Sequence, residues 1–155
     1  MKKIILSSED YLIDFEVLAI QSNIENEVAF IYQFNKYFDT KFSKDNSLDV
    51  YHEKQKFCYS VFTYINTESF ENYKLYKNRP NLKRVTNEIE NPSLFDLFQL
   101  SPFLIPSCKS FNYLLKVPIG LEQNELYLKL KVLNDLISKI KIVENTSKKV
   151  KNLLS

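Results

Sequence analysis

An apolar segment from Phe111 to Val117 constrains the fold of this chain more than any other feature. Two turns that carry prolines, at Pro102 and Pro106, lead into it. Its length and its aromatic and branched side chains are typical of a strand that crosses a hydrophobic core. We therefore expect residues 111–117 to form the central strand of a sheet.

The first third of the chain predicts a strand followed by a helix. Residues 11–22 alternate with apolar side chains on both faces, which favours an interior strand. Ser22 and Glu25 have the spacing of a capping box, in which the two side chains bond the first free amides of a helix. Apolar residues then recur at helical spacing, so we expect a helix from about residue 24 to residue 38.

The middle of the chain predicts a hairpin. Residues 57–66 and 70–78 alternate and are rich in tyrosine, and residues 66–69 supply a turn. The preceding segment, residues 39–55, is polar and contains His52, for which a solvated loop or edge position is expected. A cap at Ser93 and an apolar run that Pro102 ends predict a short helix near residues 93–100.

The last third predicts a second helix and a strand. Leucine and isoleucine spacings favour a helix over residues 121–140 that packs on the sheet. Residues 126–132 also alternate with period two, so a strand there remains an alternative. Residues 139–144 are expected to form a short last strand.

These elements predict an α+β fold with two layers. A mixed, mostly antiparallel sheet would carry the two main helices on one face, with a split βαβ unit in the C-terminal half. A length of 155 residues fits one domain, residues 1–155, with residues 81–101 as an insertion and residues 145–155 as a polar, lysine-rich end. No secretory leader or membrane-length apolar run is visible in the sequence, so we expect a cytoplasmic protein with reduced cysteines.

The sequence offers little for catalysis. Gly120 is the only glycine, which excludes the glycine-rich loops that bind dinucleotides or nucleoside triphosphates. His52 is the only histidine, and although Asp49 and Glu53 are close in sequence, a solvated position is the favoured interpretation. We therefore assign no catalytic residue, no metal ligand and no cofactor, and expect the protein not to be an enzyme.

Residues 105–113, Ile-Pro-Ser-Cys-Lys-Ser-Phe-Asn-Tyr, resemble the signature of the IPExxxVDY family. That family is a group of small bacterial proteins, mainly from Bacteroidota, without an assigned activity. Ile105, Pro106 and Tyr113 agree with the signature, whereas Ser107 and Asn112 stand where the family has acids. Because neither replacement ionises, the segment is interpreted as structural: Ile105 and Pro106 fix the path of the chain, and Tyr113 packs from the strand.

Three functions from different classes follow from these features. The leading hypothesis is a non-catalytic protein-interaction module that meets a protein partner, or a second copy, through Phe95 and Phe98 or through an open sheet edge. The alternative is an RNA-associated protein that combines the tyrosine-rich hairpin with a polyanion-binding set at the C-terminus: Lys148, Lys149 and Lys151. A small-ligand binder or enzyme is the third hypothesis, and it requires a pocket with convergent polar groups.

Overall fold

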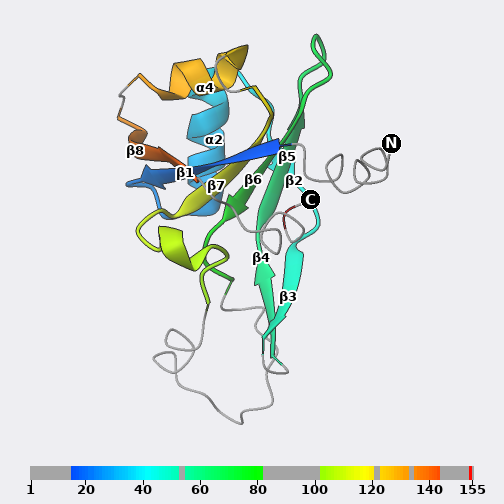
Figure 1. The fold of residues 1–155 in the computed structure, drawn as a ribbon, viewed down its shortest axis with the longest axis vertical. Coiled ribbons are helices and arrows are strands. Elements are labelled where there is room, and N and C mark those ends of the chain that lie inside the picture. The colour runs from blue at the N-terminus through cyan, green and yellow to red at the C-terminus, as the bar shows by residue number, and fades with distance from the viewer. Residues whose placement is uncertain are drawn as a thin grey trace, which may run out of the picture.

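The computed structural model describes residues 15–52, 55–81, 102–120, 123–132, 135–143 and residue 154. It has an α+β fold in which a six-stranded antiparallel sheet is accompanied by a separate two-stranded sheet (Figure 1). The elements in chain order are β1 (Phe15–Ser22), α2 (Glu27–Phe38), β2 (Ser43–Lys44), β3 (Leu48–His52), β4 (Gln55–Tyr59), β5 (Val61–Ile65), β6 (Asn72–Lys77), the 3-10 turn η2 (Pro106–Cys108), β7 (Tyr113–Pro118), α4 (Glu125–Leu130) and β8 (Ile137–Ile142).

The main sheet has the strand order β2-β5-β6-β7-β1-β8. The predicted central strand, β7, lies inside the sheet between β6 and β1. Both β7 and β8 run antiparallel to β1, so they are parallel to each other, and the chain connects them through α4. The C-terminal half therefore contains the expected split βαβ arrangement. Every described pairing is antiparallel, however, so the prediction of a mixed sheet was wrong.

The two faces of the main sheet carry different covers. On one face, which we call the helix face, buried side chains of α2 and α4 pack against Leu18, Leu115 and other residues of the strands. Figure 1 shows the two helices lying close together there. On the opposite face, the loop face, Val17 and Leu114 pack against β4 and against residues 104–111. Because strand side chains alternate, each central strand contributes to both cores.

The predicted capping box is absent. Helix α2 begins at Glu27, and the cap is Asn26, whose side-chain oxygen accepts a hydrogen bond from the amide of Ala29 at 2.9 Å. Ser22 instead ends β1, where its hydroxyl donates to the carbonyl of Leu136 at 2.7 Å and accepts from the amide of Ile24. A contact 114 residues away along the chain thus takes the hydroxyl that the capping prediction assigned to the helix.

The predicted single strand over residues 57–66 is also wrong. The chain leaves the main sheet at Ser60, so that β5 pairs with β6 whereas β4 pairs with β3 in the separate sheet. Figure 1 shows this second hairpin extending beyond the main sheet. The polar segment 39–55 contains β2 and β3 and reaches into β4 at Gln55.

The predicted long helix over residues 121–140 is short in the structure. Asn124 caps α4 by accepting from the amide of Tyr127 at 2.9 Å, and the helix ends at Leu130. This outcome removes the alternative of a strand over residues 126–132. Strand β8 begins at Ile137, where alternating lysine and isoleucine side chains give the period of a strand. The predicted helix at residues 93–100 and the boundaries of the insertion lie outside the described residues.

Candidate functional site: a basic pocket beside the signature loop

The functional candidate is built around residues 103–112, which we call the signature loop. Asn78, directly after β6, is completely buried and holds this loop. Its side-chain amide donates to the carbonyls of Cys108 and Phe111, both at 3.0 Å, and its side-chain oxygen accepts from the amide of Ile105 at 2.9 Å. Its own backbone also bonds Leu104 and Asn112. One side chain therefore sets the path of the whole loop.

Asn112 ties the end of the loop to β1. Its side-chain oxygen accepts from the amide of Ser22, and its side-chain nitrogen donates to the carbonyl of Ser22, both at 2.9 Å. The same nitrogen donates to the carboxylate of Glu25 at 3.0 Å. Only a side chain that both donates and accepts can make this set of bonds. Asn112 thus joins the end of the loop to β1 through both atoms of its side-chain amide.

The signature loop, the end of β1 and the end of β6 enclose a pocket of about 460 Å³. A pocket of this size is in the range that holds small ligands or a few side chains of a partner. Its lining residues are Gln21, Ser22, Asn23, Glu25, Lys77, Arg79, Phe103, Lys109, Ser110, Phe111 and Asn112.

Cations around the pocket are placed against aromatic rings. The Arg79 guanidinium lies 4.4 Å from the ring centre of Phe103. The Lys139 amine lies 5.7 Å from the ring centre of Phe111 and brings the edge strand β8 next to the pocket. Such placements restrict long, flexible side chains, so less conformational entropy is lost when an anion binds.

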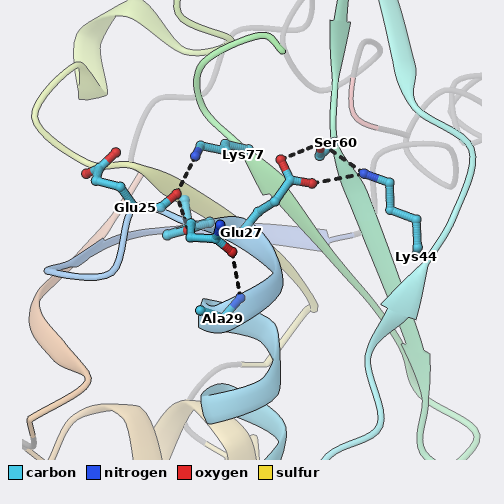
Figure 2. Close-up of polar contacts among 8 residues, drawn as sticks. Glu25, Glu27, Ala29, Lys44, Ser60 and Lys77 are labelled. Carbon is cyan, nitrogen blue, oxygen red and sulfur yellow. Dashed lines mark hydrogen bonds and ion pairs between the residues drawn. The ribbon is translucent and has the colours of Figure 1, made fainter. Parts of the chain in front are cut away.

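Lys77 is the third of these cations. Its amine lies 5.8 Å from the ring centre of Tyr113 and donates to the carbonyl of Glu25 at 2.6 Å (Figure 2). Lys109 is exposed at the rim of the pocket. Among the described residues that line the pocket, Glu25 is the only acid, beside Lys77, Arg79 and Lys109, so this part of the lining is net positive.

A second acid nearby, Glu27, is held by hydrogen bonds to Ser60 and Lys44. The Glu27 carboxylate accepts from the Ser60 hydroxyl at 2.9 Å and from the Lys44 amine at 3.0 Å (Figure 2). Partial burial raises the pKa of Glu27, but the bonds from Ser60 and Lys44 and the charges of Lys44 and Lys77 outweigh it and hold that pKa below its usual value. A carboxylate with a lowered pKa is a poor base for a serine hydroxyl, so this group of side chains stabilises the strand break at Ser60 and does not activate a nucleophile.

Two polar side chains of the pocket, Ser22 and Glu25, are engaged in hydrogen bonds with other parts of the chain. The Ser22 hydroxyl is bound to the Leu136 carbonyl, and Glu25 is held by Asn112, which leaves neither poised as nucleophile or base. Within the ranges that the structure describes, no three histidine, cysteine, aspartate or glutamate side chains are grouped so that they could hold a metal ion. What the geometry provides is a set of fixed positive charges.

A larger hollow of about 850 Å³ lies at the other end of the sheet, between the end of α2, the β5–β6 turn and α4. Its charge is opposite: Asp39, Glu68, Glu71 and Glu125 outnumber Lys41 and Lys129. Burial, and then the charges of Asp39, Glu68 and Glu125, raise the pKa of Tyr64 in its wall. Among the described residues, the lining of this hollow is thus net negative, whereas the lining of the pocket beside the signature loop is net positive.

A partly buried lysine, Lys116, lies on the loop face of β7. Its amine donates to the carbonyl of Leu154 at 3.2 Å and lies 4.7 Å from the ring centre of Phe15. Burial, and then the charge of Lys74 on the neighbouring strand, lower the pKa of Lys116 to about 8. The Tyr76 hydroxyl donates to the same Leu154 carbonyl at 2.7 Å, so these contacts anchor residue 154 on the sheet.

The signature residues predicted from the sequence lie in and beside the loop. Ile105 is buried, and Pro106 begins the 3-10 turn. Tyr113 is completely buried and stacks on Phe30 with 3.8 Å between ring centres, while its hydroxyl donates to the carbonyl of Ile24 at 3.0 Å.

Of the other predicted residues, His52 lies within the described chain, and it is not among the residues that line the pocket. His52 ends β3, far in sequence from the loop. The predicted partner-binding and polyanion-binding residues lie outside the described residues: Phe95, Phe98, Lys148, Lys149 and Lys151. Three tyrosines of the hairpin that was predicted to stack bases are buried, and so is one tyrosine of the neighbouring strand β7: Tyr59, Tyr73, Tyr76 and Tyr113.

The sequence reasoning missed Asn78, Arg79 and Lys109. One signal was available, since Arg79 is one of only two arginines and follows a predicted strand directly. Asn78 gave no comparable signal, because its partners lie 27 to 33 residues further along the chain.

Comparison with family models, with curated proteins and with solved structures found no match to this chain. The resemblance of residues 105–113 to the IPExxxVDY family therefore stays a prediction. In the part of the chain that the structure describes, no helix combines the length and the hydrophobicity needed to cross a membrane.

Proposed function

We propose that this protein is a non-catalytic interaction module that binds an acidic segment of a partner protein in the pocket beside the signature loop. The observation that carries the proposal is the set of cations fixed on aromatic rings: Arg79 on Phe103, Lys139 on Phe111 and Lys77 on Tyr113. Arginine with a planar guanidinium suits carboxylates, and fixed lysines add to the local field.

Rigidity supports the same proposal. Asn78 holds the loop through three side-chain hydrogen bonds, and Asn112 ties it to β1 through two more. The positive charges are therefore held at defined positions before any ligand arrives. A preformed site of this kind binds without the entropic cost of ordering its own loop.

The rings support a protein ligand over a nucleic acid. Single-stranded nucleic acids bind by stacking bases on exposed aromatic faces. Phe111 and Tyr113 are buried, and the cations already lie over Phe103 and Phe111. A carboxylate can bind to the cations without an exposed ring, so an acidic peptide is the ligand that this site favours.

Charge reversal at the rim tests the proposal. A short Glu-rich peptide and an oligonucleotide of equal charge, each fluorescently labelled, are titrated with the protein and followed by anisotropy. Lys109→Glu should weaken peptide binding roughly two- to thirtyfold, since it removes one attraction and adds one repulsion at an exposed position.

Lys36→Glu is the matched control, because Lys36 is an exposed lysine on α2 that does not line the pocket. It should leave the affinity near that of the unaltered protein. Equal weakening by both variants would show binding to net charge alone, and a preference for the oligonucleotide would replace the proposed ligand by a nucleic acid.

A further inference from the structure

Strand β8 is an edge of the main sheet. Among the described strands, β1 is its only neighbour, and the pairing runs from Ser22↔Ile137 to Leu18↔Ile142. An edge strand presents a row of backbone donors and acceptors to any further strand. The outer side of β8 is therefore a place where a partner's backbone can bind.

The pairing shows which residues of β8 direct their backbone outward. The amide of Val143 donates inward to the carbonyl of Val17 at 2.9 Å. Successive residues of an antiparallel strand bond to opposite neighbours. Ile140 and Ile142 are thus the residues whose amides and carbonyls point to the open edge.

The side chains of β8 divide cleanly by charge. Lys139 and Lys141 are opposite Gln21 and Ala19, and both are exposed on the loop face, beside the basic pocket. Ile140 and Ile142 are opposite Ile20 and Leu18 on the helix face. A strand added to β8 would therefore meet two positive charges on one face and two apolar side chains on the other.

We propose that β8 accepts an extended segment of a partner protein in which acidic and apolar residues alternate, so that the segment becomes a seventh strand of the sheet. The proposal rests on the proposed function, because it specifies the form of the acidic segment that the pocket attracts. Acids opposite Lys139 and Lys141 form cross-strand charge pairs, and apolar residues between them cover Ile140 and Ile142.

The same pattern disfavours a second copy of this chain at this edge. Antiparallel pairing of β8 with itself places Lys139 and Lys141 opposite lysines, and like charges directly across a ladder repel. Lysines on an edge also discourage uncharged strands. The two lysines thus favour an acidic strand by attracting it, and they disfavour a second β8 strand by repelling its lysines.

Two peptides of identical composition test the proposal with the full chain. One is a short, end-capped peptide of alternating Glu and Val, and the other has the same residues with the acids in one block. We expect the alternating peptide to bind about tenfold or more tightly than the block peptide, since only alternation places every acid on the lysine face.

Charge reversal of the edge adds a second readout. Lys139→Glu with Lys141→Glu should weaken the alternating Glu/Val peptide about tenfold or more, and an alternating Lys/Val peptide should recover the lost affinity on that variant. Lys36→Glu is the control and should change neither. Without recovery by the Lys/Val peptide, the charge pairing across β8 is wrong.

Amide hydrogen exchange locates the bound strand. Bound Glu/Val peptide should slow exchange at Ile140 and Ile142, whose amides point outward, with smaller changes at Lys139 and Lys141. Equal affinity for the two peptides, or no slowing at Ile140 and Ile142, would refute strand addition. If both peptides bind and respond to Lys109→Glu alone, the pocket function stands and the edge proposal fails; if neither binds, both fail.

Discussion

Asparagine 78 offers the sharpest test of how the signature loop is held. Asn78→Asp keeps the size and shape of the side chain and keeps the oxygen that accepts from Ile105. It removes the nitrogen that donates to the carbonyls of Cys108 and Phe111. Both of those bonds are buried, so each carbonyl loses its partner away from water.

The size of the effect follows from these two bonds. A buried acceptor left without its donor costs about 1–3 kcal/mol, which gives a loss of roughly 2–6 kcal/mol in the free energy of unfolding. Placing a carboxylate beside two carbonyls adds to the loss. Because domains of this size are stable by only about 5–15 kcal/mol, N78D should be severely destabilised.

Urea unfolding followed by circular dichroism measures the change. Asn66→Asp is the matched control, since the Asn66 side-chain oxygen accepts from the amides of Glu68 and Ser69 in an exposed turn, and the substitution keeps this oxygen. N66D should stay within about 0.5 kcal/mol of the unaltered protein. An N78D protein as stable as N66D would refute the claim that Asn78 holds the loop.

Two further predictions concern stability. Asn112→Asp removes the hydrogen bonds that the side chain donates to the Ser22 carbonyl and to Glu25, so the free energy of unfolding in urea at neutral pH should fall by about 1–3 kcal/mol. Adding Glu25→Gln removes the repulsion between the two carboxylates and should recover part of this loss. No recovery would contradict the contact between residues 112 and 25. The pKa of Lys116 is about 8 in the folded chain and about 10.5 when unfolded, so the unfolded chain binds more protons in between and stability should rise with pH from 8 to 10.5. Lys116→Met should abolish that rise, and an unchanged profile would exclude Lys116 as its source. Above pH 10.5 the trend should reverse, because burial raises the pKa of Tyr59 to about 12 and favours the protonated folded state.

Local patterns were sufficient to predict β1, β7 and most of the first helix. The alternation of β1 and the apolar run of β7 mark strands that are buried on both faces, and the helical spacing of Phe30, Phe34 and Phe38 marks α2. These patterns predict the elements correctly because the buried side chains of each element recur with the period of that element.

The errors arose where a distant residue decides the local structure. Ser22 and Asn26 are both good helix caps, and the carbonyl of Leu136 decides between them by engaging Ser22. Likewise the predicted strand over residues 57–66 is divided at Ser60, where Glu27 and Lys44 bind the serine hydroxyl. Neither contact is visible in a short window of sequence.

The basic pocket could not be predicted for a related reason. Its cations come from the end of β6, the signature loop and β8, which are far apart in the sequence. Lysine was also discounted as a signal, since 19 of the 21 basic residues are lysines and composition alone explains many of them. Only the fold shows that three cations lie against three rings.

The most direct test of the central claim is a titration of the isotopically labelled protein with the alternating Glu/Val peptide, followed by amide chemical shifts. The account predicts that the shifts change at Lys77, Arg79 and Lys109 around the pocket and extend to Ile140 and Ile142 on β8. Shift changes confined to the acidic hollow around Glu71 and Glu125, or an unchanged spectrum at saturating peptide, would contradict it.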